Sequence, residues 1–480
     1  MPPFLLLIYL KFFEKPSFCR GKAPIFFDQQ LSISTSAASL QNSIAATFSP
    51  NKLQELARKS GFLRRQSKFK PEEFLDTLMF SDSDHSQLSL QDCCNDLLQQ
   101  RQKYLSKVAM HKRFNERSLE FLKMVLAEQM SCQLDIRQND NWRAFSRVLI
   151  ADSCKFFLPQ SYHQDYPGYR NFGVASIMNI QYAYDLKNGS WENLEFTKVT
   201  QNDQGYSNNT LERINKGDLH IRDLGFITKT YLNGIIDKGA FFLNRLPPQW
   251  VTSDCHTGER INWKKLAQKP DYIPDKHLDV WINISNGKDS FRCRLIAVAV
   301  PETVWAERVR KAGQKAKSNG TNLSEEYKAR QRFSIFITNA DEKTLKATEV
   351  VQLYRLRWQI ELTFKVWKSL LNIHKVKAVK RERLESQLIA KFIWILLNWK
   401  IFRCVSAFVS VGSSLKHCSL WKFFKHVRHY RFTLRKVVAG QMSLTNWLEI
   451  FITPLINYLL IEPRKGRKSS YCIVNEIFKS

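Results

Sequence analysis

The chain has 480 residues, and its 73 Lys and Arg residues against 44 Asp and Glu residues give a formal net charge of +29. Such a length exceeds a usual single domain, and such a charge favours a polyanionic partner, either nucleic acid or an anionic membrane surface. The 10 cysteines include no Cys-x2-Cys pair, which argues against a zinc ribbon and a disulfide scaffold and favours a reducing cytoplasm.

Residues 1–45 are expected to form a poorly ordered N-terminal extension. They combine a short apolar leader with a Ser- and Ala-rich run, a composition with little capacity to bury a core. The leader, Phe4–Leu10, is too short to span a membrane and lacks a preceding basic cluster. Phe392–Trp399 and Phe451–Ile461 are also too short and indicate buried helices, so we predict no membrane segment.

Residues 46–135 are predicted to be helical, because apolar residues recur there at spacings of three and four. The region therefore indicates a helical module ahead of the rest of the chain. The expected helices cover Asn51–Gly61, Pro71–Met79, Leu88–Arg101 and Phe114–Met130.

Two carboxylates come at the ends of short apolar strands. Asp152 directly follows Ile150 and Ala151, and Asp223 ends the strand that begins at Leu219. The alternative for each is an Asp that only starts a turn. Asp218 is a rival for the second position, but it precedes its strand rather than ending it, so we favour Asp223.

The segments around these acids alternate between strands and helices. A hairpin is expected around Asn188-Gly189, followed by a short helix before Asp223. Its strands would be Val174–Tyr184 and Trp191–Val199. A helix over Ile227–Lys238 and a strand over Ala240–Arg245 would then follow the second acid.

Residues 247–332 are predicted to form a β-rich insertion. Polar and apolar residues alternate in Val280–Ile284 and Phe291–Val300, as they do in half-buried strands. The basic segment Arg308–Arg332 is expected to be a loop.

The stretch Tyr354–Lys368 is the most distinctive part of the chain. Read as one helix, at about 100° per residue, it gathers a carboxylate and its basic neighbours within an arc of about 60°. The members of this arc are Tyr354, Arg357, Glu361 and Lys368. The simpler alternative is a solvated helix in which Glu361 and Lys365 form an ion pair.

The spacing Tyr-x2-Arg-x3-Glu-x6-Lys over these residues resembles the signature of DDE transposases of the insertion sequence 4 family. At the second acid, Asp223, Gly225 and Phe226 match an Asp-x-Gly-aromatic pattern of that family. Cys154 departs from it, because the family usually has Thr or Ser there. The resemblance implies that Asp152, Asp223 and Glu361 are the catalytic, metal-binding carboxylates.

The resemblance also implies a fold. It would be α/β, a ribonuclease-H-like mixed sheet with helices on both faces, and the insertion at 247–332 would separate the second and third acids. The catalytic domain would span residues 140–400, between a helical DNA-end-binding domain at 46–135 and a basic helical C-terminal region at 401–480. For residues 46–135 a helical interaction module is the alternative.

Three carboxylates suit cleavage of a phosphodiester, because two Mg²⁺ ions held by hard oxygens stabilise charge on the attacking and leaving oxygens. Mn²⁺ is the expected substitute. Arg357, Lys365 and Lys368 would contact DNA phosphates. Tyr354 would bind a phosphate or a base, and Trp358 would either stack on an unpaired base or pack in the core.

These inferences together predict a transposase that cuts and transfers DNA strands at the ends of its own insertion sequence. We expect double-stranded DNA and a second copy of the chain on paired ends as partners, and a cytoplasmic, nucleoid-associated location. Lys365–Arg403 supports a DNA partner, with ten basic against two acidic residues. The alternatives are a domesticated, catalytically silent DNA-binding protein and a basic membrane-surface protein.

Overall fold

The computed structural model describes residues 25–65, 67–81, 88–132, 134, 144–169, 175–268, 277–284, 290–412 and 417–461. The chain divides into two compact units. The described parts of residues 1–138, 157–165 and 363–466 form the first, which we call the helical unit. The described parts of residues 139–156 and 166–362 form the second, the sheet unit.

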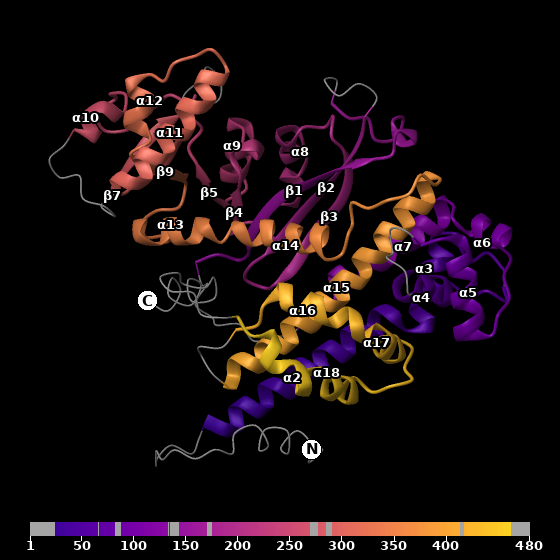
Figure 1. Ribbon diagram of the computed structural model, residues 1–480. Helices are drawn as coiled ribbons and strands as arrows, with labels where there is room; N and C mark the ends of the chain where they lie inside the picture. Colours follow the sequence, from indigo (N-terminus) through magenta and orange to yellow (C-terminus); the bar gives the residue numbers. More distant parts are fainter. Residues whose placement is uncertain are drawn as a thin grey trace. The chain divides into compact units, whose positions relative to one another are not determined.

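The described residues of the sheet unit build one mixed sheet, in the order β3-β2-β1-β4-β5-β9-β8-β7-β6 (Figure 1). Strand β4 pairs in parallel with β1 and β5, whereas β2 pairs with β3, and β5 with β9, in antiparallel fashion. The strands are β1 (Val148–Leu158), β2 (Ser176–Asp185), β3 (Ser190–Lys198), β4 (Leu219–Arg222), β5 (Phe241–Arg245), β6 (Thr252–Asp254), β7 (His277–Ile284), β8 (Phe291–Ala299) and β9 (Phe333–Thr338).

The hairpin and the strands around the two acids follow the sequence closely. Strands β2 and β3 confirm the predicted hairpin, and Gly189 in its turn has a φ of 66°, which glycine adopts without strain. The strand end expected at Asp152 is wrong, because β1 continues to Leu158. Cys154, Phe156 and Leu158 keep the alternate burial of a strand beyond the acid.

The helices of the sheet unit lie between its strands along the chain. The short helix expected before Asp223 and the helix expected after it are both present, as α8 and α9. The helices are α8 (Asp203–Asn209), α9 (Lys229–Asp237), α10 (Trp263–Ala267), α11 (Glu302–Ser318), α12 (Glu325–Arg330) and α13 (Ala347–Arg355), with 3₁₀ helices at Leu211–Arg213 and Leu224–Phe226.

The insertion extends the main sheet instead of forming a sheet of its own. Strands β7 and β8 confirm the two predicted strands, and β8 pairs with β9, which returns to β5. Buried apolar residues of β5, β8, β9 and α9 form one continuous core. The loop expected at Arg308–Arg332 is wrong, because most of it lies in α11 and α12, where Glu307 pairs with Arg310 and Lys311 one turn later.

The helical unit is built around α15, which runs from Arg381 to Gly412 and contacts α2, α4, α7 and α16. The four helices predicted between residues 46 and 135 are confirmed, as α3, α4, α5 and α7. Its other helices are α2 (Ile25–Phe48), α3 (Pro50–Lys59), α4 (Pro71–Phe80), α5 (Leu90–Arg101), α6 (Lys107–Arg113), α7 (Glu116–Ser131), α16 (Leu420–Val427), α17 (Arg431–Val438) and α18 (Leu444–Leu459), with 3₁₀ helices at Gln160–Tyr162 and Arg428–Tyr430.

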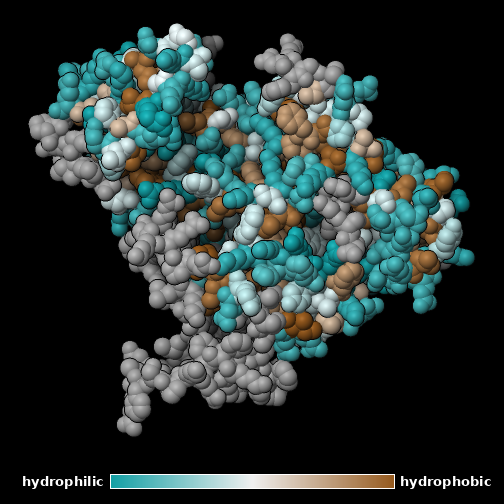
Figure 2. Space-filling view, in the orientation of Figure 1, coloured by the Kyte–Doolittle hydropathy of each residue, from teal (hydrophilic) through white to brown (hydrophobic). Residues whose placement is uncertain are grey.

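Helix α2 differs from the extension expected over residues 1–45, of which residues 1–24 lie outside the described part. Leu40, Ile44 and Phe48, spaced by one helical turn, are buried, and α2 contacts α15. Packing on α15 therefore stabilises a segment whose composition alone does not predict order. No helix among the described residues has the length and apolar character to cross a membrane. Hydrophilic side chains dominate the coloured surface in Figure 2, and the hydrophobic ones are scattered between them.

Candidate active site

The first two predicted acids lie side by side on neighbouring parallel strands. The register pairs Ala151 of β1 with Arg222 of β4, so Asp152 and Asp223 are the next residues on the two strands. Asp223 keeps an extended backbone, with φ −76° and ψ 162°. Paired strands are about 4.8 Å apart, so local strand pairing alone brings these two carboxylates together.

Arg357 joins the third acid to the first. Its guanidinium donates through Nη1 to Oδ2 of Asp152 at 3.3 Å and through Nη2 to Oε1 of Glu361 at 2.7 Å. The side chain of Arg357 is 16% exposed and that of Glu361 is 42% exposed, so the cluster opens to solvent on the side of the third acid. Residues more than 200 positions apart in the chain thus meet at one cation.

Burial and neighbouring charges act together on Asp152. Loss of solvent raises the pKa of its carboxyl to about 6, and the negative charges of Asp223 and Glu361 push in the same direction. The backbone N–H of Ser153 and the guanidinium of Arg357 oppose this rise. All three predicted acids therefore lie close enough to influence one ionisation.

The side chain of Tyr354 is buried beside Arg357 and is not exposed to solvent. It is 8% exposed, its ring lies 5.2 Å from that of Phe336, and burial raises the pKa of its hydroxyl. The guanidinium carbons of Arg357 and Arg245 lie 6.0 and 5.8 Å from the ring centroid. This arrangement suits a residue that positions Arg357 better than one that stacks on a base.

The single helix expected over Tyr354–Lys368 is wrong. Helix α13 ends at Arg355, and α14 (Trp358–Ser369) begins after a tightened turn. The N–H of Arg357 bonds to the carbonyl of Tyr354, and that of Ile360 to the carbonyl of Arg357, both three residues back. Arg357 therefore sits at a junction between two helices, not on the face of one.

The remaining predicted contact residues are divided between the two units. Trp358 is 62% exposed, so the alternative that it packs in the core is wrong. Lys365 and Lys368 follow in the part of α14 that belongs to the helical unit. Within that unit, Nζ of Lys365 lies 5.5 Å from the ring centroid of Trp421.

Asp218, the rival second acid, has a structural role. Its side chain is fully buried, and both of its oxygens accept hydrogen bonds from Arg147, at 2.9 and 2.5 Å. Gly225 has no positive φ that would require glycine, and a side chain added there would meet nothing within 4 Å. Arg245 was not predicted, and its only signal in the sequence is a cation at the end of β5, the strand that follows Asp223.

The described residues contain no group of three His, Cys, Asp or Glu side chains placed to hold a metal ion. Arg357 is hydrogen-bonded to both Asp152 and Glu361. The donor set itself consists of carboxylate oxygens, which suit Mg²⁺ or Mn²⁺ and not softer metals. Arg357 places a positive charge between two of the three acids, whose negative charges would otherwise repel each other.

A family profile described as "Transposase DDE domain" matches residues 143–397, which is more than half of the chain. The chain belongs to this DDE transposase family. The match covers the strands and helices that carry all three acids. This transposase is thus an enzyme that acts on DNA and cleaves it, as the resemblance of its Tyr-x2-Arg-x3-Glu-x6-Lys spacing implied.

Two named transposases are similar to this chain over most of their length, and a third is similar over a smaller part. The transposase for insertion sequence element IS231F of Bacillus thuringiensis subsp. israelensis is 28% identical over 443 residues, which is 88% of this chain and 90% of the relative. The transposase for IS1151 of Clostridium perfringens is 25% identical over 456 residues, which is 91% and 96% of the two chains. The putative transposase InsL for IS186A of Escherichia coli (strain K12) is 28% identical, over 36% of this chain and 45% of the relative.

Proposed function

We propose that this transposase cleaves and transfers DNA strands at the ends of its own insertion sequence, in a cut-and-paste reaction that depends on Mg²⁺, and that it belongs to the insertion sequence 4 family. The observation that carries the proposal is the meeting of Asp152 and Asp223 on paired strands with Glu361 through Arg357. The Tyr-x2-Arg-x3-Glu-x6-Lys spacing and relatives that serve insertion sequences support the family.

The strand order supports a ribonuclease-H-like catalytic domain over residues 140–400. Three strands in the order β3-β2-β1 lie next to β4 and β5, and the first acid lies on the central strand β1. The parallel pairing of β1 with β4 places Asp152, in the middle of β1, beside Asp223, which directly follows β4.

Asp152, Asp223 and Glu361 would hold two Mg²⁺ ions, or Mn²⁺ in their place. When bound, such ions stabilise negative charge on the attacking and leaving oxygens of the phosphodiester. Arg357 would then be free to bind a DNA phosphate, and buried Tyr354 keeps its guanidinium in place. Exposed Trp358 is available for an unpaired base, and Lys365 and Lys368 for phosphates further along the strand.

We further propose that residues 46–135 bind the element ends and that two copies of the chain assemble on paired ends, in the cytoplasm at the nucleoid. Exposed Lys112 and half-buried Arg113 at the end of α6 are available for phosphate contacts. The basic C-terminal region from residue 401 adds to the positive charge of the helical unit.

The test is a strand-cleavage assay on duplex DNA that carries the inverted repeats flanking the gene. With Mg²⁺ we expect cleavage by the wild type and a loss of at least about 10²–10³-fold for Asp152→Asn and for Glu361→Gln, because each removes a charged ligand. Glu342→Gln, an exposed acid ahead of α13, is the matched control and should cleave normally.

Equal cleavage by all four proteins would show that the three acids are not the active site. DNA binding by the wild type without any cleavage would favour the silent DNA-binding protein instead.

A further inference from the structure

A cavity lies within the sheet unit on the face opposite the three acids. Its volume is about 70 Å³, and it lies between strands β1 to β4 and the segment from α8 to Ile214. Ala151 lines it, and since side chains alternate along a strand, the neighbouring Asp152 points to the other face. The lining residues are Arg147, Leu149, Ala151, Gln181, Tyr182, Ala183, Glu192, Asn193, Tyr206, Thr210, Arg213, Ile214, His220, Arg222 and Phe226.

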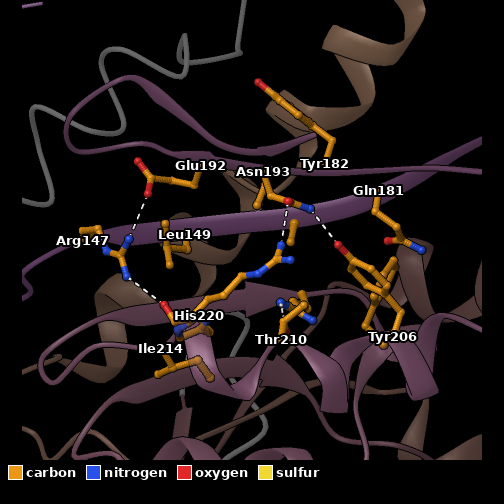
Figure 3. A pocket seen from close by; sticks show the side chains of 15 residues that line it. Arg147, Leu149, Gln181, Tyr182, Glu192, Asn193, Tyr206, Thr210, Ile214 and His220 are labelled. Carbon is orange, nitrogen blue, oxygen red and sulfur yellow. Dashed lines mark hydrogen bonds and ion pairs between the residues drawn. The ribbon is translucent and has the colours of Figure 1, made fainter. Parts of the chain in front are cut away.

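One wall of the cavity is a network of polar side chains whose hydrogen bonds are mutually satisfied. Figure 3 shows Arg147 donating to Glu192, at 2.9 Å, and Asn193 donating to the hydroxyl of Tyr206, at 2.7 Å. Arg213 donates to the side-chain oxygen of Asn193 at 2.7 Å. These groups hold one another in fixed positions, so the wall is formed before any ligand arrives.

Arg222 on β4 is the exception, because its charge is buried without a counterion. The residue is 6% exposed, and its guanidinium donates only to the hydroxyls of Ser207 and Thr210, at 2.8 and 3.1 Å. Within the described part of the chain no carboxylate pairs with it, and its Nε is buried without a hydrogen-bond partner. The ring of Tyr231, 4.7 Å away, offers only a weak attraction for the cation.

His220 adds a second unsatisfied nitrogen to the same cavity. It is 5% exposed, and its Nε2 has no hydrogen-bond partner. The nearest acid oxygen, Oδ2 of Asp218, is 3.9 Å away and already bonded to Arg147. Burial and the neighbouring arginines lower the pKa of His220 well below its usual range, so the ring is neutral and can donate one hydrogen bond.

A buried charge without a partner costs several kcal/mol, so proteins seldom keep one that binds nothing. The cavity has room for several water molecules or for one tetrahedral oxyanion. We infer that it is a binding site for a small oxyanion of phosphate size, held by Arg222 and His220. The site lies on the opposite face of the sheet from the strand-cleavage site, so the inference stands or fails separately from the proposed function.

The first test measures the thermal stability of the full chain with inorganic phosphate, against KCl at equal ionic strength. For the wild type we expect a saturable rise in Tm of about 2–4 °C or more, because the ligand binds only the folded state. Arg222→Met should lose this rise. Arg260→Met, an exposed arginine in the same unit, should keep it and so account for phosphate bound to the basic surface.

An equal rise in the wild type and Arg222→Met, or none in the wild type, would overturn the inference. A short duplex DNA distinguishes the source of the phosphate, since an Arg222-dependent rise with DNA would mean that the site takes a backbone phosphate and not a small ion. If Arg222→Met does not fold, Arg222→Lys takes its place in the comparison. Lysine keeps the charge but lacks the forked guanidinium, so the affinity for phosphate should fall at least about tenfold.

A second test needs no variant. In crystals of the full chain grown with selenate, an oxyanion of similar shape, we expect an anomalous selenium peak within hydrogen-bond distance of the Arg222 side chain. Selenate at other positions with only water in the cavity would overturn the inference.

Discussion

Arg435 of the helical unit and Arg222 of the sheet unit are buried to the same degree, at 5% and 6% exposure, yet their surroundings differ completely. Arg435 donates to both oxygens of Asp76 and both oxygens of Asp96, over distances of 2.6 to 3.1 Å. Among the residues that the structure describes, Arg222 reaches two hydroxyls and no acid. Burial alone therefore does not reveal what a charged residue does.

The two arginines differ in the structural connections that they make. Arg435 on α17 ties the C-terminal helices to α4 and α5, so residues far apart in sequence fold as one body. Lys400 likewise connects α15 to α2 and to the end of α7, because it donates to Ser43 and to the carbonyls of Gln129 and Cys132. In the sheet unit, Arg222 is instead buried beside two hydroxyls, and Asp152 is buried near two other acids, and both arrangements cost stability.

The largest effect that would test this comparison is the loss of Arg435. Arg435→Met leaves Asp76 and Asp96 buried without their main counterion, so we expect a loss of about 3–5 kcal/mol in the free energy of unfolding. Arg222→Met should be neutral or stabilising in phosphate-free buffer, since it removes an unpaired charge. Urea denaturation measures both, with exposed Arg428→Met as control. Similar losses in both variants would remove the distinction between the units.

The pH dependence of stability gives a second measure within the helical unit. Burial lowers the pKa of Lys400 to about 8, so between about pH 8 and its ordinary value of 10.5 the unfolded chain binds more protons than the folded one. Stability from this group therefore rises with pH across that window, by roughly 3 kcal/mol. We expect the wild type to gain stability relative to Lys400→Met over this range, as followed by urea midpoints. If stability changed with pH in the same way in both proteins, the pKa of Lys400 would not be lowered by burial.

The smallest effect is expected at Asp152, with the opposite sign. Its pKa is raised from 3.8 to about 6, so the folded state holds this proton more tightly than the unfolded chain. The stabilising contribution is complete below about pH 4 and is lost as the pH rises through 6, at a cost of roughly 3 kcal/mol. Without divalent metal, the wild type should lose stability relative to Asp152→Asn over that range. A constant difference between the two proteins would show that burial does not raise the pKa of Asp152.

Much of the local structure could be predicted because its causes are local. The hairpin at Gly189 follows from a residue that accepts positive φ. Helix α5 starts where Ser89 and Asp92 form a reciprocal cap. Helix α2 could not be predicted, since burial of Leu40 and Ile44 depends on α15, which lies more than 300 residues later in the chain.

The candidate active-site residues show the same division between local and long-range causes. The periodicity of Tyr354–Lys368 predicted one continuous helix, because the spacing of residues can be compared only with an ideal helix. The tightened turn at Arg357 became visible only with its contact to Asp152, 205 residues away in the chain. Arg245 and Arg222 carried no distinctive pattern, and they became notable only through burial and through the rings and cavity beside them.

The order of residues in this chain determined by itself which side chains could bind metal and DNA, and which short segments would become strands and helices. Chemistry and local backbone preference are written residue by residue, so they can be read without the fold. Only the tertiary structure decided that Asp152, Asp223 and Glu361 share one electrostatic environment and that Arg222 lies in a cavity without a counterion. Distances between remote residues and access to solvent arise from the whole folded chain, and no local pattern encodes them.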